Sequence, residues 1–312
     1  MRTIKFLISL ILLFAVSAFA DYEDTQILSL SADGIEELQI DCGAGYLQIK
    51  GVDGLATIEV EAEIYIEGMR KSKAQDFIED NMNLSLRERG KTARLNSNFD
   101  NSGFSFGLFT GYRSAGINLT INVPKNMILD IDDGSGDIII EDIENEIEID
   151  DGSGDIEIEN VIDRLDITDG SGDLRLTDIE GDIRLNDGSG ELIFDNIKGN
   201  IDIDDGSGDI EFEKIIGSIE LDDGSGEIDA TGIEGDFFID DGSGNIDIRD
   251  VTGDVEIDDS SGDMEIVKIG GTVIVEDGSG SIRIDDVRGD VEIIDDDSGR
   301  CRITNVDGRI KD

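Results

Sequence analysis

Apolar residues recur at five fixed places in a repeating unit that covers most of this chain. In the copy at 170–187, GSGDLRLTDIEGDIRLND, they are Leu174, Leu176, Ile179, Ile183 and Leu185. With the first glycine of a copy numbered as position 1, these are positions 5, 7, 10, 14 and 16. Positions 5 and 7 alternate with polar residues, as do 14 and 16, which is the period of a strand with one buried face. Each copy therefore predicts two short strands, each followed by a turn.

The spacing of the copies predicts how these strands are arranged. Position 1 falls at Gly134, Gly152, Gly170, Gly188, Gly206, Gly224, Gly242, Ser260 and Gly278, and at Asp297 after one inserted residue. A meander of hairpins has no need of a constant step, whereas in a coil the step places each residue directly above its equivalent in the coil below. We therefore predict an all-β parallel β-solenoid with 18-residue coils, two short strands per coil and about 4.8 Å between coils.

The N-terminal part holds an imperfect copy and an insertion. The stretch IDCGAGYLQI at 40–49 resembles a repeat in which Cys42 stands for the aspartate of the turn. The chain then departs from the repeat over about 66–100, where the spacing of apolar residues predicts a short helix near Lys71 to Asn81 and a hairpin turning at 89–91. We expect this small α/β insert to close the N-terminal end of the solenoid, because an open sheet end invites further strand pairing.

Three segments follow from these patterns. Residues 1–20 have Arg2 and Lys5 before an apolar run and end in Ala18-Phe19-Ala20, which is typical of a secretory signal peptide. Residues 21–125 form the N-terminal part of the solenoid, with the insert and an aromatic, glycine-rich loop at 99–115. Residues 126–312 form the regular array, with a C-terminal cap where basic residues gather in 281–312.

Several stretches together resemble the bacterial "putative adhesin" family of unknown function, the toastrack domain. They are ADGIEELQIDCGAGYLQIKG, the helix KSKAQDFIEDN, the segment INLTINVPKNMILDIDDGSGDI and the serial Gly-Ser-Gly-Asp-Ile phrases. The resemblance covers nearly the whole chain after the signal. It implies a β-solenoid in a surface or envelope protein, and it brings no catalytic residues.

Composition narrows the classes of partner. The chain has a formal net charge of −50 and no histidine, so its surface repels nucleic acid and anionic lipid. We expect export to the extracellular space, the cell surface or the periplasm, with no segment that spans a membrane. Cys42 and Cys301 are too few for a disulfide scaffold, and we expect no bridge between them.

Aspartate occupies position 18 of successive copies and is the main candidate for chemistry. Stacked like charges about 4.8 Å apart repel by about 0.9 kcal/mol per pair even in water, so something must offset the repulsion. One candidate is calcium, which takes oxygen ligands from carboxylates and turn carbonyls. The other is a hydrogen bond from each turn to its aspartate. The candidate metal ligands are Asp151, Asp169, Asp187, Asp205, Asp223 and Asp241.

Aromatic residues are concentrated in 99–112, FDNSGFSFGLFTGY. One interpretation is a loop that covers the apolar interior at an open solenoid end. The other is an exposed contact for a partner. The candidate contact residues are Phe104, Phe106, Phe109 and Tyr112.

The leading functional hypothesis is a secreted, non-enzymatic surface or envelope scaffold that resembles an adhesin, with no required cofactor. Its partner would be a protein or glycan at the cell surface, and the sequence leaves the oligomeric state open. The second hypothesis is an acidic structural repeat protein that depends on calcium. The third is a carbohydrate-active enzyme, which the absence of histidine and the uniformity of the repeat disfavour.

Overall fold

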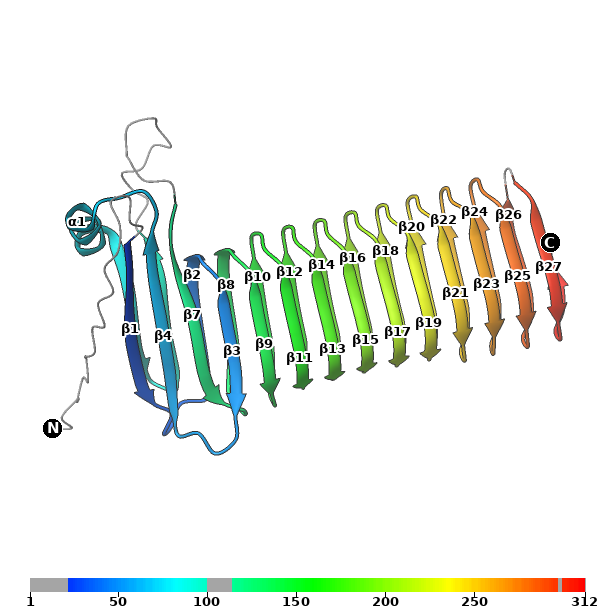
Figure 1. Ribbon diagram of the computed structural model, residues 1–312. Helices are drawn as coiled ribbons and strands as arrows, with labels where there is room; N and C mark the ends of the chain where they lie inside the picture. Colours follow the sequence, from blue (N-terminus) through cyan, green and yellow to red (C-terminus); the bar gives the residue numbers. More distant parts are fainter. Residues whose placement is uncertain (1–21, 100–113, 297–298, 312) are drawn as a thin grey trace. The chain divides into compact units, whose positions relative to one another are not determined.

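The computed structural model describes residues 22–99, 114–296 and 299–311 (Figure 1). The predicted signal peptide lies outside these residues. The chain forms two compact units, Met1–Gly154 and Asp155–Asp312. Strands and one helix make up the regular structure of the described residues, and the strands stack as 18-residue coils, so the predicted all-β parallel solenoid is confirmed.

Two sheets form the first unit. One has the strand order β1-β4-β7-β3-β9 and the other β10-β8-β2-β6-β5. Pairs β1/β4, β4/β7 and β5/β6 are antiparallel, and β3/β7, β3/β9, β2/β6, β2/β8 and β8/β10 are parallel. The bounds are β1 Tyr22–Ser31, β2 Glu37–Ala44, β3 Leu47–Val52, β4 Thr57–Ile66, β5 Met82–Arg89, β6 Thr92–Phe99, β7 Ala115–Pro124, β8 Ile128–Ser135, β9 Ile138–Ile143 and β10 Ile147–Asp151.

The predicted helix and hairpin are both present in this unit. Helix α1 spans Lys71–Asn81 and buries Ala74, and β5 and β6 form the hairpin that turns at Gly90 and Lys91. Phe77 of the helix stacks on Phe99 at the end of β6, with ring centroids 5.4 Å apart. Among the residues described, no helix is long and apolar enough to cross a membrane.

The second unit consists of parallel coils in regular register (Figure 1). Odd-numbered strands β11 to β27 form one sheet in chain order, and even-numbered strands β12 to β28 form the other. Leu174 pairs with Leu192 and Ile183 with Ile201, so each residue pairs with its equivalent in the next copy. The bounds are β11 Ile156–Ile162, β12 Leu165–Asp169, β13 Leu174–Glu180, β14 Ile183–Asp187, β15 Leu192–Lys198, β16 Ile201–Asp205, β17 Ile210–Ile216, β18 Ile219–Asp223, β19 Ile228–Glu234, β20 Phe237–Asp241, β21 Ile246–Val251, β22 Val255–Asp259, β23 Met264–Ile269, β24 Val273–Asp277, β25 Ile282–Val287, β26 Val291–Asp296, β27 Cys301–Val306 and β28 Ile310–Lys311.

A left-handed residue at position 9 explains why position 10 faces the interior. Asn160, Asp178 and Asn196 have φ values of 58°, 56° and 58°, a region that aspartate, asparagine and glycine tolerate better than other residues. The turn of the backbone there shifts the alternation by one residue. Positions 7 and 10 can therefore both be buried, as Leu176 and Ile179 are.

The interior packs one coil against the next with compensating volumes. Phe194 stacks on Phe212 at 4.9 Å between ring centroids. The next residue in that row is Ala230, and Phe237 of the same coil packs edge-on against Phe212 at 5.6 Å. A large residue at position 14 thus fills the space left by a small one at position 7, which keeps the core dense.

The inserted residue near the C-terminus is absorbed by a β-bulge. The register between β24 and β26 shifts after Val275, which pairs with Ile293, so that Glu276 pairs with Asp295. Ile294 is the extra residue and is 57% exposed. In the last coil Cys301, Ile303 and Val306 are only half-buried, because none of the described residues pairs with the outer edge of β27.

Candidate functional site

The aspartates at position 18 lie inside the solenoid. Each is between 1% and 4% exposed. In the second unit the strand register stacks Asp187 on Asp205, Asp205 on Asp223 and so on to Asp277. In the first unit Asp151 pairs with Asp133. We call these residues the aspartate column of each unit: Asp133 and Asp151 in the first unit, and Asp169, Asp187, Asp205, Asp223, Asp241, Asp259 and Asp277 in the second.

The turn hydrogen bond predicted from the sequence is present. In the turn after Asp223, the backbone N–H of Ser225 donates to Oδ1 of Asp223 at 2.9 Å. The same bond, between 2.8 and 3.3 Å, forms after Asp151, Asp169, Asp205, Asp241, Asp259 and Asp277. It satisfies an amide that the strand ladders do not reach, which explains why position 18 is aspartate in the regular copies.

The second oxygen of these carboxyl groups has a different environment. Oδ2 of Asp205, Asp223, Asp241 and Asp259 is buried and accepts no hydrogen bond from the described residues. Burial, with the charge of stacked neighbours, raises the pKa of Asp205 and Asp241 to about 7. Burial raises the pKa of Asp259 to about 6 and that of Asp223 above its ordinary value. A buried carboxyl without a cationic partner favours its neutral form.

The predicted metal ligands do not converge. The register pairs them one above another along the column, and in the described part of the chain no three acidic or cysteine side chains surround a common point that could hold a metal ion. The geometry of these residues therefore identifies no metal site. Calcium binding stays a prediction from the sequence.

Cys42 continues the aspartate column in the first unit, as the imperfect repeat predicted. It pairs in register with Asp133 on one side and Ser97 on the other. Burial, followed by the charge of Asp133, raises the pKa of the Cys42 thiol well above its ordinary value. The thiol is thus kept protonated and unreactive. Neither Cys42 nor Cys301 forms a disulfide bond.

Two further ladders of side chains run along the coils, and neither was predicted from the sequence. At position 4, Oδ1 of Asp209 accepts the backbone N–H of Glu227 in the next coil at 2.9 Å. At position 13, Asp236 accepts the N–H of Asp254 at 2.9 Å, and Asp254 that of Thr272 at 2.6 Å. These amides precede the strands. The signal in the sequence is the recurrence of Asp or Asn after glycine at positions 4 and 13.

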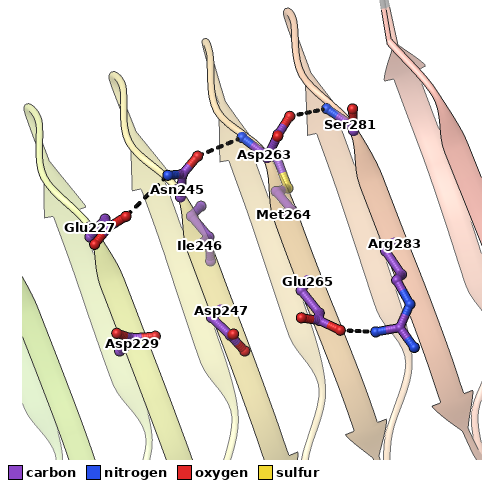
Figure 2. A pocket seen from close by; sticks show the side chains of 10 residues that line it. All are labelled: Glu227, Asp229, Asn245, Ile246, Asp247, Asp263, Met264, Glu265, Ser281 and Arg283. Carbon is purple, nitrogen blue, oxygen red and sulfur yellow. Dashed lines mark hydrogen bonds and ion pairs between the residues drawn. The ribbon is translucent and has the colours of Figure 1, made fainter.

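An open groove of about 540 Å³ crosses the outer face of the odd-numbered strands (Figure 2). Asn245 and Asp263 of the position-4 ladder line one side, and Asp229, Asp247 and Glu265 lie along the strands. Glu265 pairs with Arg283, as the figure shows, and with Arg249 at 2.8 Å. Carboxylates here are thus held by arginines of neighbouring coils, and the described residues that line the groove include no histidine, cysteine or lysine.

A second groove of about 690 Å³ lies on the outer face of the even-numbered strands. Arg184 pairs with Asp202 at 3.1 Å within it. Phe238, 40% exposed, lies at one end. Both grooves are shallow stretches of a repetitive face, with cross-strand ion pairs that stabilise the surface modestly.

The candidate contact residues Phe104, Phe106, Phe109 and Tyr112 lie outside the described residues. The structure therefore tests neither the plug nor the contact interpretation.

Comparison with known proteins identifies a family for most of the chain. Residues 35–237 match the family model described as Toastrack DUF4097. No curated protein sequence matches the chain.

Solved structures resemble this chain at low identity. One is of a "putative cell adhesion protein" from Clostridium sporogenes, with 10% identity over 93% of this chain and 100% of that chain, and a TM-score of 0.29. Two are from Parabacteroides distasonis. A "putative lipid binding protein" has 14% identity over 92% of this chain and 97% of that chain, with a TM-score of 0.33, and a "putative adhesin" has 14% identity over 92% and 96%, with a TM-score of 0.32. Likenesses at this level carry no conclusion about what this chain binds.

Proposed function

The chain belongs to the Toastrack DUF4097 family, and on this premise we propose that it is an exported, non-enzymatic scaffold module of the bacterial cell surface or envelope, with a role in adhesion. The observation that supports the proposal best is the constant register of the odd-numbered strands in the second unit. From β11 to β25 every coil pairs with the next at a step of one repeat. Such a unit presents the same rows of side chains again and again, which suits a spacer or a repeated contact surface.

The geometry of the grooves supports a role without catalysis. A catalytic site needs a distinct cleft in which a nucleophile or a general acid or base has its own environment. In the groove on the odd-numbered strands, arginines engage Asp247 and Glu265, and the amide of the next coil engages Asp263. These three carboxylates of the groove therefore already have an arginine or a backbone amide as partner.

A cell-surface protein or glycan is the partner class that fits an acidic module of this kind. The proposed contact residues remain Phe104, Phe106, Phe109 and Tyr112. Large aromatic side chains contribute more to binding than other residues when they contact a partner.

The proposal is tested by location and binding together. In the source bacterium we expect the protein without residues 1–20, outside the inner membrane, and we expect purified mature protein to compete with intact cells for attachment to their surface. A variant with Phe104, Phe106 and Phe109 replaced by Ala should lose competition at an unchanged melting temperature. Retention of the whole chain in the cytoplasm, or a measurable turnover of polysaccharide, would rule out the proposal.

A further inference from the structure

The aspartate column brings carboxyl groups together in an unusual way. Within the second unit, the parallel register places Asp205 directly between Asp187 and Asp223, and Asp241 directly between Asp223 and Asp259. Adjacent coils are about 4.8 Å apart. Both side-chain oxygens of Asp187 and Oδ2 of Asp205 are buried and have no hydrogen-bond partner among the described residues. Two carboxyl groups can form a hydrogen bond only when one of them carries a proton.

No cation of the described chain balances these groups. The side chains whose charge acts on Asp223 are Asp222 of the same strand and Asp209 of an adjacent turn. On Asp241 they are Asp223, Asp240 and Asp259, and on Asp259 they are Asp258 and Asp277. Among the residues described, no lysine or arginine acts on these three carboxyls. Two neighbouring, buried and unpaired carboxylates are strongly unfavourable.

We infer that the aspartate column is a buried proton-binding ladder, in which carboxyl groups of the folded chain hold protons near neutral pH and share them with the carboxyl of the next coil. The Oδ1 atom keeps its turn amide, so the proton is carried by Oδ2, the atom left without a partner. A protonated Oδ2 donates to a carboxyl oxygen of the adjacent coil. The hydrogen bonds then run along the column in the same direction as the backbone ladders.

The ladder makes the stability of the fold depend on pH. The pKa of Asp205 and Asp241 is raised to about 7 and that of Asp133, Asp151 and Asp259 to about 6, first of all by burial. An aspartate in the unfolded chain titrates near 3.9. Between these values the folded chain binds more protons than the unfolded chain, so the free energy of unfolding falls as the pH rises from about 4 to about 6 to 7, and it levels off above this range. Acidification from pH 8 to pH 5 therefore stabilises the module.

Direct titration of the full mature protein tests the ladder. In carbon-detected NMR of protein with labelled aspartate, we expect the carboxyl carbons of Asp205 and Asp241 to titrate near pH 7 and those of Asp133, Asp151 and Asp259 near pH 6. Infrared spectra at pH 7 should show the carbonyl stretch of protonated carboxyl groups. Midpoints near 4 for all aspartates, with no such band at pH 7, would overturn the inference.

Matched variants separate the buried column from the acidic surface. Replacing Asp205, Asp223 and Asp241 by Asn keeps an Oδ1 acceptor for each turn and supplies an N–H donor in place of the proton. We expect this variant to lose most of the rise in melting temperature between pH 8 and pH 5. The control replaces Asp204, Asp222 and Asp240, the exposed residues one position earlier, by Asn. This control variant should keep most of the rise in melting temperature.

An equal loss of the rise in the two variants would contradict the ladder, because surface repulsion would then explain the pH dependence. Addition of calcium tests whether a metal ion, and not protons, neutralises the column. If millimolar calcium at pH 8 raises the melting temperature of the wild type but not of the buried variant, the column binds a metal ion and the inference fails. The NMR and infrared measurements need only the wild type, so they decide the question even if the variants do not fold.

Discussion

At the level of single residues, the distance between coils determines where glycine is needed. A Cβ atom added to Gly208 at position 3 would lie 1.7 Å from the carbonyl oxygen of Gly190 in the coil below, and Gly208 has φ +157°. A Cβ added to Gly199 at position 12 would lie 2.0 Å from the oxygen of Gly181. No rotamer relieves a clash between a Cβ and a backbone oxygen, so the coils themselves would have to separate.

We therefore expect Gly208→Ala to be among the most destabilising single substitutions, by roughly 3 kcal/mol or more. The matched control is Gly232→Asn. Gly232 has φ +77°, the nearest atom to a Cβ added there is 3.7 Å away, and Asn196 holds the equivalent position with φ 58°. The control should change stability by no more than about 0.5 kcal/mol. Urea unfolding of both variants gives the comparison, and similar losses would refute the role of coil spacing.

The position-4 ladder is a second requirement at the residue scale. Asp209→Ala removes the acceptor of the Glu227 amide, at a cost of about 1 kcal/mol. If the loss is local, hydrogen exchange at the Glu227 amide should be about five times faster. Asp209→Asn should preserve protection, because Asn245 accepts the equivalent amide of Asp263 at 3.1 Å. Unchanged exchange in Asp209→Ala would show that water replaces the carboxylate without loss.

At the level of elements, much of the fold followed from the sequence. The strands, their register and the buried positions could be predicted because the 18-residue period repeats many times. The pairing of Leu174 with Leu192, its equivalent in the next copy, confirms the predicted register. The helix and hairpin followed from spacing and from the turn at Gly90.

The interior location of the aspartate column did not follow from the sequence. An Asp next to glycine in a turn is usually exposed, and period alone does not give the direction of its side chain. The antiparallel pairing of β1 and β4 was equally hidden, because these strands lack the repeat and pair across a separation that local pattern does not encode. The position-4 and position-13 ladders were missed because they join equivalent residues in different coils.

Coil-sized changes give a prediction at this scale. Deletion of residues 206–223 removes one complete coil, β17 and β18, and brings Phe194 against Phe237 in the place that Phe212 held. We expect a folded protein whose melting temperature falls by only a few degrees, roughly the contribution of one repeat and one interface. Circular dichroism and thermal unfolding measure this.

Deletion of only 206–214 is the matched control for the coil deletion. It removes most of β17 with its turn, so the following strands would have to change sheets and the left-handed residue at position 9 would be lost. This variant should lose cooperative unfolding. If both deletions behave alike, the 18-residue coil is not the folding unit.

At the level of the whole molecule, charge is the dominant feature. The formal net charge is −50, and its ion pairs lie at the surface; in the pair of Arg184 with Asp202 the side chains are 65% and 55% exposed. Such pairs contribute little each. The remaining carboxylates repel one another over distances longer than a single coil, and this repulsion lowers the stability of the folded state.

Salt should therefore stabilise this protein. Raising sodium chloride from about 0.01 M to about 0.15 M shortens the screening length from about 30 Å to about 8 Å. Charges on adjacent coils still repel one another at this screening length, but the repulsion between more distant charges is removed. We expect the melting temperature at pH 8 to rise by roughly 5 °C, a gain of about 2 kcal/mol.

Potassium chloride should act in the same way, because screening depends on ionic strength and not on the identity of the cation. Calcium chloride and magnesium chloride at matched ionic strength extend the test: equal effects indicate screening, whereas a gain found with calcium alone would demonstrate the specific site that the acidic repeat predicted. A melting temperature that does not change with sodium chloride would contradict the role assigned to repulsion.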